Sequence, residues 1–146
     1  MIAAGSIAAE THRFGVAWLL LCVALSLHVL DEALTGFLPG YNATVRAIRE
    51  RFRFVPLPVF SLRVWLAGLC IAILAAFSMS PLAFRGSGFT VGVAYPLGVL
   101  MIGNALGHIG ASVYRRRMMP GVYSSPLLLF ASVYLLICAE RIRNAA

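Results

Sequence analysis

Four long runs of apolar residues divide this chain and limit what it can fold into. They cover about residues 14–32, 59–77, 89–113 and 122–139, and each is long enough to cross a membrane as a helix. With 61% hydrophobic residues, 12% charged residues and a mean hydropathy of +0.90, the 146-residue chain is too apolar for a soluble domain. We therefore expect an all-α, polytopic four-helix membrane bundle, with residues 1–146 forming a single transmembrane domain.

The connection between the first two runs has a pattern of its own. Over residues 42–55, apolar side chains recur at helical spacing while most of the arginines take the opposite face. This pattern predicts a short amphipathic helix lying in the membrane interface, with an ordinary solvated loop helix as the alternative. Pro56 and Pro58 are expected to end it.

Glycine, proline and serine residues predict where the membrane helices begin and end. Residues 35–40 are expected to stop the first span, and residues 78–81 to break the second span before a short loop. Pro96 should loosen or kink the third span. Ser124 or Ser125 is expected to cap the fourth span, with the proline that follows in its first turn.

All twelve basic residues are arginines, and most of them lie between the apolar runs. Despite the net charge of +7, this placement is typical of membrane topology signals, so we expect no nucleic-acid partner. Loops one and three share one side of the membrane and hold seven arginines: Arg46, Arg49, Arg51, Arg53, Arg115, Arg116 and Arg117. The termini and loop two share the other side and hold four: Arg13, Arg85, Arg141 and Arg143. We therefore expect a bacterial inner (plasma) membrane protein with both termini outside and loops one and three cytoplasmic.

The three cysteines point to packing rather than to disulfides. Cys22, Cys70 and Cys138 lie in three different apolar runs, and no two of them have the C-x-x-C spacing. We expect all three to be inert thiols that pack inside the bundle.

A cluster of ionisable residues closes the first apolar run. His28, Asp31 and Glu32 occupy positions i, i+3 and i+4, which share one face of a helix. Ionisable groups inside a membrane segment are costly and mark functional sites by default. The two carboxylates also lie at the C-terminal end of a helix, where the helix dipole disfavours anions. A cationic partner is therefore expected: an arginine, a protonated histidine or a metal ion.

A second polar set lies in the third run, where Asn104, His108 and Ser112 repeat at i, i+4 and i+8. At about 1.5 Å per residue from the expected span starts, the His28–Glu32 cluster comes to depths of roughly 21–27 Å, and Asn104 and His108 come to roughly 22–29 Å. Spans one and three run parallel, so the two sets should meet at one level near the arginine-rich side. Arg63 begins the second span at that level, where its guanidinium either snorkels or pairs with a carboxylate. The opposite end of the bundle is expected to be plain hydrocarbon.

These positions resemble the motifs of a known family. His28-Val29-Leu30-Asp31-Glu32 is similar to an H-x-x-E-E motif, Asn104 and His108 to an N-x-x-x-H pair, and Pro120-Gly121 to the end of a Y-x-P-G motif. On these motifs, in this order, the chain resembles the HXXEE family of small integral membrane proteins, over roughly residues 25–130. The resemblance implies a four-helix membrane fold and a supporting role for Pro120 and Gly121, but no activity, because the family is uncharacterised.

Two residues depart from the family pattern. Asp31 stands where the family has its first glutamate, which keeps the charge and shortens the side chain by one methylene. Met118 stands at the tyrosine position of the Y-x-P-G motif, so this chain has no hydroxyl at that position.

The first functional hypothesis is a metal site. His28, Asp31, Glu32 and His108 offer two imidazoles and two carboxylates, a set suited to zinc or non-haem iron, and Asn104 is expected to orient His108. Water activated by the metal would then hydrolyse or otherwise modify a lipid-like substrate. The lipid bilayer is the expected environment.

Three alternatives remain open at this point, so the sequence alone does not decide whether the chain is an enzyme. The same residues suit metal-free acid/base catalysis on a lipophilic substrate, or proton or ion handling. The polar cluster also has a purely structural reading, in which it only holds helices one and three together. Separately, Gly103 and Gly107 are spaced four apart and mark a face through which copies of the chain would associate.

Overall fold

The computed structural model describes residues 2–54 and 56–145, and side chains from residue 7 onward. The elements are all helices in the described part of the chain: α1 (Ile2–Thr35), α2 (Phe37–Arg51), α3 (Leu62–Ser78), α4 (Ser80–Phe84), α5 (Gly88–Arg115) and α6 (Ser125–Ala145). Four helical segments are long and apolar enough to cross a membrane: Ile7–Thr35, Leu62–Phe84, Gly88–Arg115 and Ser125–Ala145. The expected all-α fold, with four helices long and apolar enough to cross a membrane, is thereby confirmed. Met1 and Ala146, the ends of the expected domain, lie outside the described residues.

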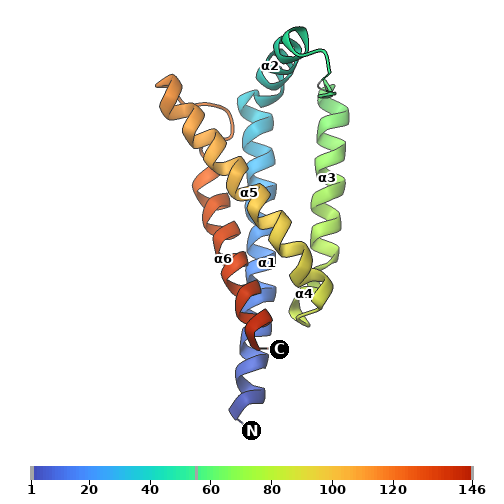
Figure 1. Ribbon diagram of the computed structural model, residues 1–146, viewed down its shortest axis with the longest axis vertical. Helices are drawn as coiled ribbons and strands as arrows, with labels where there is room; N and C mark the ends of the chain where they lie inside the picture. Colours follow the sequence, from blue (N-terminus) through green and yellow to red (C-terminus); the bar gives the residue numbers. More distant parts are fainter. Residues whose placement is uncertain (1, 55, 146) are drawn as a thin grey trace.

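The helices are arranged around α1. Helices α1 and α6 lie side by side, α5 crosses them, and α2 lies across one end and leads toward α3 (Figure 1). The two ends of the chain lie at the opposite end of the bundle from α2 and from the α5–α6 connection (Figure 1). This arrangement puts the C-terminal ends of α1 and α5 together with the start of α6.

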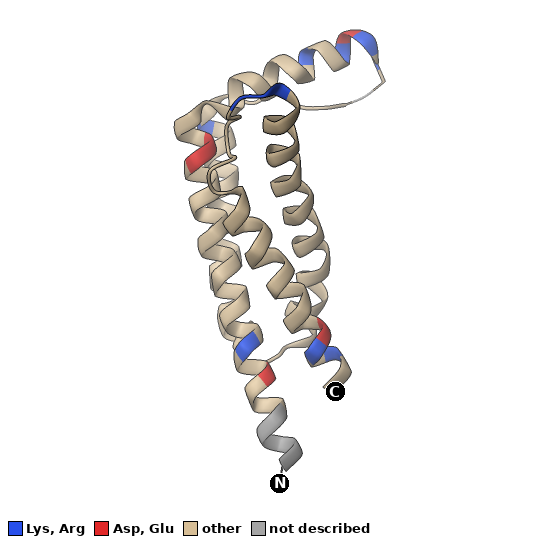
Figure 2. Ribbon diagram, turned by 90° about the vertical axis from the view of Figure 1, so that its left-hand side faces the viewer, with Lys and Arg blue, Asp and Glu red and all other residues tan. Residues whose placement is uncertain are grey.

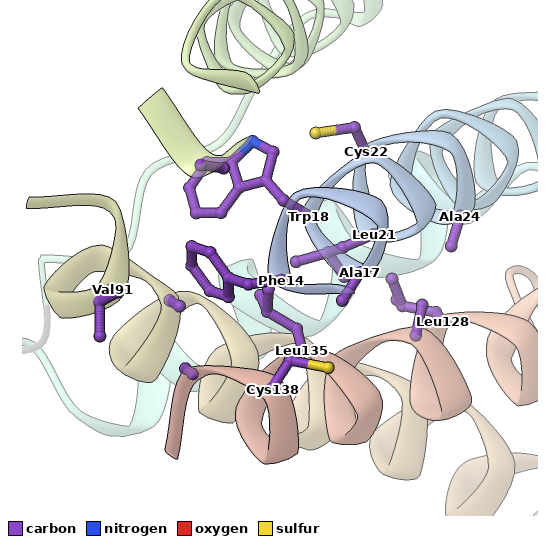
Figure 3. Packing of buried hydrophobic residues seen from close by; sticks show 14 of the residues in the cluster. Phe14, Ala17, Trp18, Leu21, Cys22, Ala24, Val91, Leu128, Leu135 and Cys138 are labelled. Carbon is purple, nitrogen blue, oxygen red and sulfur yellow. The ribbon is translucent and has the colours of Figure 1, made fainter. Parts of the chain in front are cut away.

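The core lies between α1, α5 and α6. Phe14 and Leu21 of α1 are buried in one cluster with Leu128 and Leu135 of α6, whereas the buried Trp18 lies on the α3–α4 side of α1 (Figure 3). In a membrane such burial stabilises through close packing, because lipid tails are as apolar as the side chains themselves. These three helices therefore form a rigid frame.

Helix α3 stands outside this frame. No residue of α3 is buried, and its polar link to α1 is the Trp18 Nε1–H, which donates to the Ala76 carbonyl at 2.8 Å. Cys70 of α3 is accordingly exposed, whereas Cys22 and Cys138 are buried in the core. The prediction that all three cysteines pack inside was wrong for Cys70, because α3 lies on the outer side of α1.

Several helix boundaries differ from those expected. Helix α1 begins well before residue 14, and the next helix begins at Phe37 rather than at 42 and ends at Arg51. Gly36, at a φ of 78°, turns the chain within one residue, and Pro39 then falls in the first turn of α2, where a missing N–H costs nothing. Residue 55, the expected end of the amphipathic helix, lies outside the described residues.

Prolines are tolerated at three further places. The loop expected after residues 78–81 is instead α4, because Met79 keeps helical dihedral angles and Pro81 sits in the first turn. Helix α5 continues as one helix through Pro96. Helix α6 has Pro126 at its second position, as predicted, and it continues to Ala145 rather than ending at 139.

The end of the bundle away from α2 is not plain hydrocarbon, which corrects that prediction. Tyr95 donates to Glu140 at 2.8 Å, and Glu10 pairs with Arg13 at 2.7 Å. Figure 2 shows basic and acidic residues at both ends of the bundle. Polar chemistry is therefore present at each end, and only the α2 end contains buried histidines among the described residues.

Candidate functional site

Three buried side chains converge at the α2 end of the bundle. Glu32 Oε1 of α1 lies 3.0 Å from His108 Nε2 of α5 and 3.7 Å from His28 Nε2, one helical turn back on α1. One ligand atom from each of the three residues lies within 4.8 Å of the other two. The two imidazole rings meet edge to face with centroids 4.9 Å apart. Two helices with matching depth thus supply the set, as the spacing along the sequence predicted.

Hydrogen bonds at Nδ1 fix the orientation of both histidines. His108 Nδ1 lies 2.6 Å from the Pro120 carbonyl oxygen, which only accepts, so Nδ1 carries the proton. His28 Nδ1 lies 2.9 Å from Ser124 Oγ, whose own proton goes to Asp31 Oδ2 at 2.8 Å. His28 Nδ1 is therefore a donor as well. Each neutral ring then has its lone pair on Nε2. The lone pair of His108 faces Glu32 Oε1 at 3.0 Å, and that of His28 accepts a hydrogen bond from Asn104 Nδ2 at 3.1 Å.

The turn at Pro120-Gly121 is shaped around His108. Gly121 has a φ of 82°, and a Cβ there would lie 2.8 Å from two atoms of the His108 ring and 3.1 Å from Glu32 Cγ. Its N–H donates to Thr35 Oγ1 at 3.3 Å, which ties the turn to the end of α1. The supporting role expected for Pro120 and Gly121 thus has a physical basis in this turn.

Asp31 lies apart from the three converging residues. Its Oδ2 accepts from the backbone N–H of Ser124 at 2.9 Å and from the Ser124 hydroxyl at 2.8 Å. Ser124 immediately precedes α6, so the carboxylate lies at the positive end of that helix dipole. The expectation that Asp31 is a fourth metal ligand does not fit this geometry, because the N-terminus of α6 supplies the cationic partner that Asp31 needs.

The remaining candidate residues have different surroundings from those expected. Asn104 Nδ2 donates to His28 Nε2 at 3.1 Å, so Asn104 orients His28 and not His108. Ser112 Oγ accepts from the Met119 N–H at 3.0 Å and so steadies the α5–α6 connection. Arg63 is exposed, and within the described part of the chain it forms no ion pair with a carboxylate.

The contact between Glu32 and His108 needs a positive charge or a proton. His108 has already committed its Nδ1 proton to the Pro120 carbonyl, so a neutral ring and an ionised Glu32 would face each other with lone pairs 3.0 Å apart. Two arrangements relieve this: a shared proton, or a cation between the two atoms. The site is therefore built either to hold a proton or to hold a metal ion.

The distances suit a small transition-metal ion. At zinc–ligand distances of about 2.0–2.2 Å, neighbouring ligand atoms of a tetrahedral site lie about 3.4 Å apart. The contacts of Glu32 Oε1 to His108 and His28, at 3.0 and 3.7 Å, lie on either side of this value. Two histidines and one carboxylate leave a fourth position free, as catalytic zinc and non-haem iron sites require.

Two cavities open beside these residues. The larger, of about 470 Å³, lies between α2 and α5 and is here called the α2–α5 cavity; its lining includes Phe37, Tyr41, Gly103, Asn104, Gly107, His108, Ala111, Arg115 and Arg117. The smaller, of about 350 Å³, is lined by Glu32 and Trp65, among others. The ring of Phe37 lies between them, 5.3 Å from that of His108 and 6.1 Å from that of Trp65. Both cavities reach residues of the site.

Sequence reasoning missed three contributors. Ser124 was expected to act as a helix cap and instead connects His28 to Asp31. Thr35 and Phe37 were assigned to a chain break, although one binds the Gly121 turn and the other packs against His108. Phe37 directly follows Gly36, the glycine expected to end the first helix, and this position was the local signal that could have identified it.

The comparisons with known proteins agree with the resemblance noted in the sequence. A family described as "Protein of unknown function with HXXEE motif" matches residues 18–135, which include every residue of the site. Neither a curated protein nor a solved structure was found to match the chain.

Proposed function

We propose that this chain, which belongs to the HXXEE family of proteins of unknown function, is a metal-dependent membrane enzyme that acts on a lipid-like substrate. The observation that supports this most is the convergence of His28 Nε2 and His108 Nε2 on one oxygen of Glu32, with both Nδ1 atoms held by fixed acceptors. Histidines that bind metals are typically held in this way.

Each residue has a distinct part in the proposal. Glu32 and the two histidines would bind a zinc or iron ion, and the bound metal would polarise a substrate carbonyl or activate water. Pro120 and Ser124 keep the proton of each imidazole on Nδ1, so that each Nε2 has a lone pair to offer a metal. At His28 the ion would displace the hydrogen bond from Asn104. The α2–α5 cavity, which His108 lines, would admit the substrate.

Metal analysis of the detergent-purified protein tests the proposal directly. We expect about one equivalent of zinc or iron per chain, lost in His108→Ala and retained in His12→Ala. His12 is a matched control, because it packs against Phe84 at the other end of the bundle. Equal metal content in His108→Ala and the unsubstituted protein, or no metal in either after gentle purification, would overturn the proposal.

A second candidate function is metal-free acid/base catalysis. It is favoured by the 3.0 Å contact between Glu32 and His108, in which a proton would be shared between a carboxylate and an imidazole. If the purified protein holds no metal but retains a lipid that turns over, and Glu32→Gln abolishes that turnover, this function replaces the first.

The orientation in the membrane forms a further part of the proposal. We place the chain in a bacterial inner membrane, and the arginine distribution supports an orientation in which α2 lies at the cytoplasmic interface and both termini lie outside. A fusion of alkaline phosphatase after Asn144 should then be active, and a fluorescent-protein fusion at the same point should be dark. The reverse pair of results would place the termini inside.

A further inference from the structure

The α2–α5 cavity carries an unbalanced positive charge. Arg115 and Arg117 both line it and are exposed, whereas no acidic residue is among its lining residues. Among the described residues, no carboxylate lies within 4.0 Å of either guanidinium. By contrast, Arg13, Arg141 and Arg143 at the other end each pair with a glutamate. The cavity therefore lacks an anion of its own.

The wall below these arginines is apolar and open. Gly103 and Gly107 of α5 line the cavity, and a Cβ at either would meet nothing within 4 Å. Phe37 and Tyr41 of α2 form the facing wall with their rings 5.9 Å apart. Tyr41 donates its hydroxyl proton to the Pro58 carbonyl, so the ring and not the hydroxyl is left to contact a ligand. This surface suits a hydrocarbon chain.

Gly103, Gly107 and Arg115 lie on one face of α5, and Arg117 follows just after the helix. Arg115 follows His108 by seven residues, which is close to two helical turns and about 10 Å along the axis. His108 and Ala111 complete the face between the glycines and the arginines. A ligand with its charged group at Arg115 would thus extend past His108.

From this charge and shape we propose that the α2–α5 cavity binds an anionic lipid with a phosphate-type headgroup. The headgroup binds Arg115 and Arg117, the chain follows Gly103 and Gly107, and the linkage between headgroup and chain lies beside His108. This inference rests on the proposed function, since it names the substrate class of the same site. Guanidinium groups at a membrane interface are suited to anionic headgroups.

Binding of phosphatidic acid with a fluorescent acyl chain tests the inference, with diacylglycerol of the same chains as the uncharged counterpart. Purified protein in phosphatidylcholine nanodiscs should prefer phosphatidic acid. The double variant Arg115→Gln with Arg117→Gln should weaken this binding about tenfold or more. Arg116→Gln is the matched control, because Arg116 lies between the two arginines and does not line the cavity. It should leave binding within about twofold of the unsubstituted protein.

A second pair of variants tests the chain-binding wall. Gly107→Leu should fill the cavity and weaken phosphatidic acid binding about tenfold or more, whereas Gly110→Leu, on an equally open glycine outside the cavity, should not. Equal effects of Gly107→Leu and Gly110→Leu would overturn the inference. So would glycerol phosphate competing as well as phosphatidic acid, since the chain would then contribute nothing. Loss of a dimer in Gly107→Leu with unchanged lipid binding would assign this face to a second copy and also overturn it.

Metal content measured in the same variants separates this inference from the proposed function. Gly107→Leu and the double arginine variant leave the three candidate metal ligands intact, so both should keep their metal. Unchanged lipid binding in these metal-loaded variants would overturn the lipid site alone. If the protein holds no metal but binds the lipid selectively, and these substitutions weaken that binding, the lipid site is supported and the metal-dependent function is overturned.

Discussion

Asp31 and Ser124 join the end of α1 to the beginning of α6 through one carboxylate oxygen. Asp31 Oδ2 accepts both the backbone N–H and the hydroxyl of Ser124, at 2.9 and 2.8 Å. The same hydroxyl accepts the Nδ1 proton of His28. A single serine thus connects helix-end electrostatics to the orientation of a candidate metal ligand.

Replacing Asp31 separates these two roles. Asp31→Asn removes the anion at the N-terminus of α6 and weakens both hydrogen bonds to Ser124, so the free energy of unfolding should fall by about 1–2 kcal/mol. Metal content should stay close to one equivalent, because Asp31 lies outside the group of three ligand atoms. Thermal unfolding in detergent and metal analysis measure the two effects. Metal lost at unchanged stability would instead make Asp31 a ligand.

Gly121→Ala should disturb the site through contact as well as through backbone strain. The φ of 82° costs about 1–3 kcal/mol for alanine, and the new Cβ would also press on the His108 ring at 2.8 Å. We expect lower stability and at least about tenfold weaker metal binding, measured by competition with a chelator.

Gly36→Ala is the matched control for Gly121→Ala. Its φ of 78° imposes a similar strain, but a Cβ there would meet nothing within 4 Å. It should therefore lower the melting temperature and leave metal affinity unchanged. Equal metal loss in the two variants would mean that backbone strain, rather than contact with His108, accounts for the effect.

The meeting of the His28–Glu32 cluster with Asn104 and His108 could be predicted because it depends on helical rise and on direction alone. Two parallel helices with polar residues at equal depth must bring them to one level. The hydrogen-bond partner of each side chain did not follow from helical rise and direction. Asn104 was expected to orient His108, as a partner that holds a metal-binding histidine, although it donates to His28 instead.

The family resemblance implied a supporting role for Pro120 and Gly121, but the contacts of the α5–α6 connection could not be predicted, because many of them are made by backbone atoms. The Pro120 carbonyl and the N–H groups of Gly121 and Ser124 carry no residue-specific pattern. Nor does hydropathy distinguish a helix packed in the frame from one beside it. The apolar segment Leu62–Phe84, which contains α3, is as apolar as the segment of α1, although only α1 is central.

Asn104→Ala tests whether the amide competes with a metal for His28. The Asn104 Nδ2–H occupies the Nε2 lone pair that a bound ion would need, and the loss of this hydrogen bond should lower metal-free stability by about 1 kcal/mol. Metal affinity should rise a fewfold, because no hydrogen bond then has to be displaced. A chelator competition assay measures it. A clear fall in affinity would show that Asn104 instead holds His28 in its metal-binding orientation.

Glu32→Gln distinguishes a metal site from a polar contact that only holds α1 and α5 together. Glutamine has the same shape, and its amide N–H would donate to the free lone pair of His108 Nε2, so the contact between the helices survives. Polar pairs between membrane helices contribute only about 0.6 kcal/mol on average, so the melting temperature should change little. Metal binding should nevertheless fall at least about tenfold, because the only carboxylate of the set has lost its charge.

Glu32→Ala is the companion variant, since it removes both the contact and the charge. If Glu32→Gln keeps the metal content of the unsubstituted protein, Glu32 is not a ligand. If that protein holds no metal and only Glu32→Ala lowers the melting temperature, the cluster serves to hold the helices together.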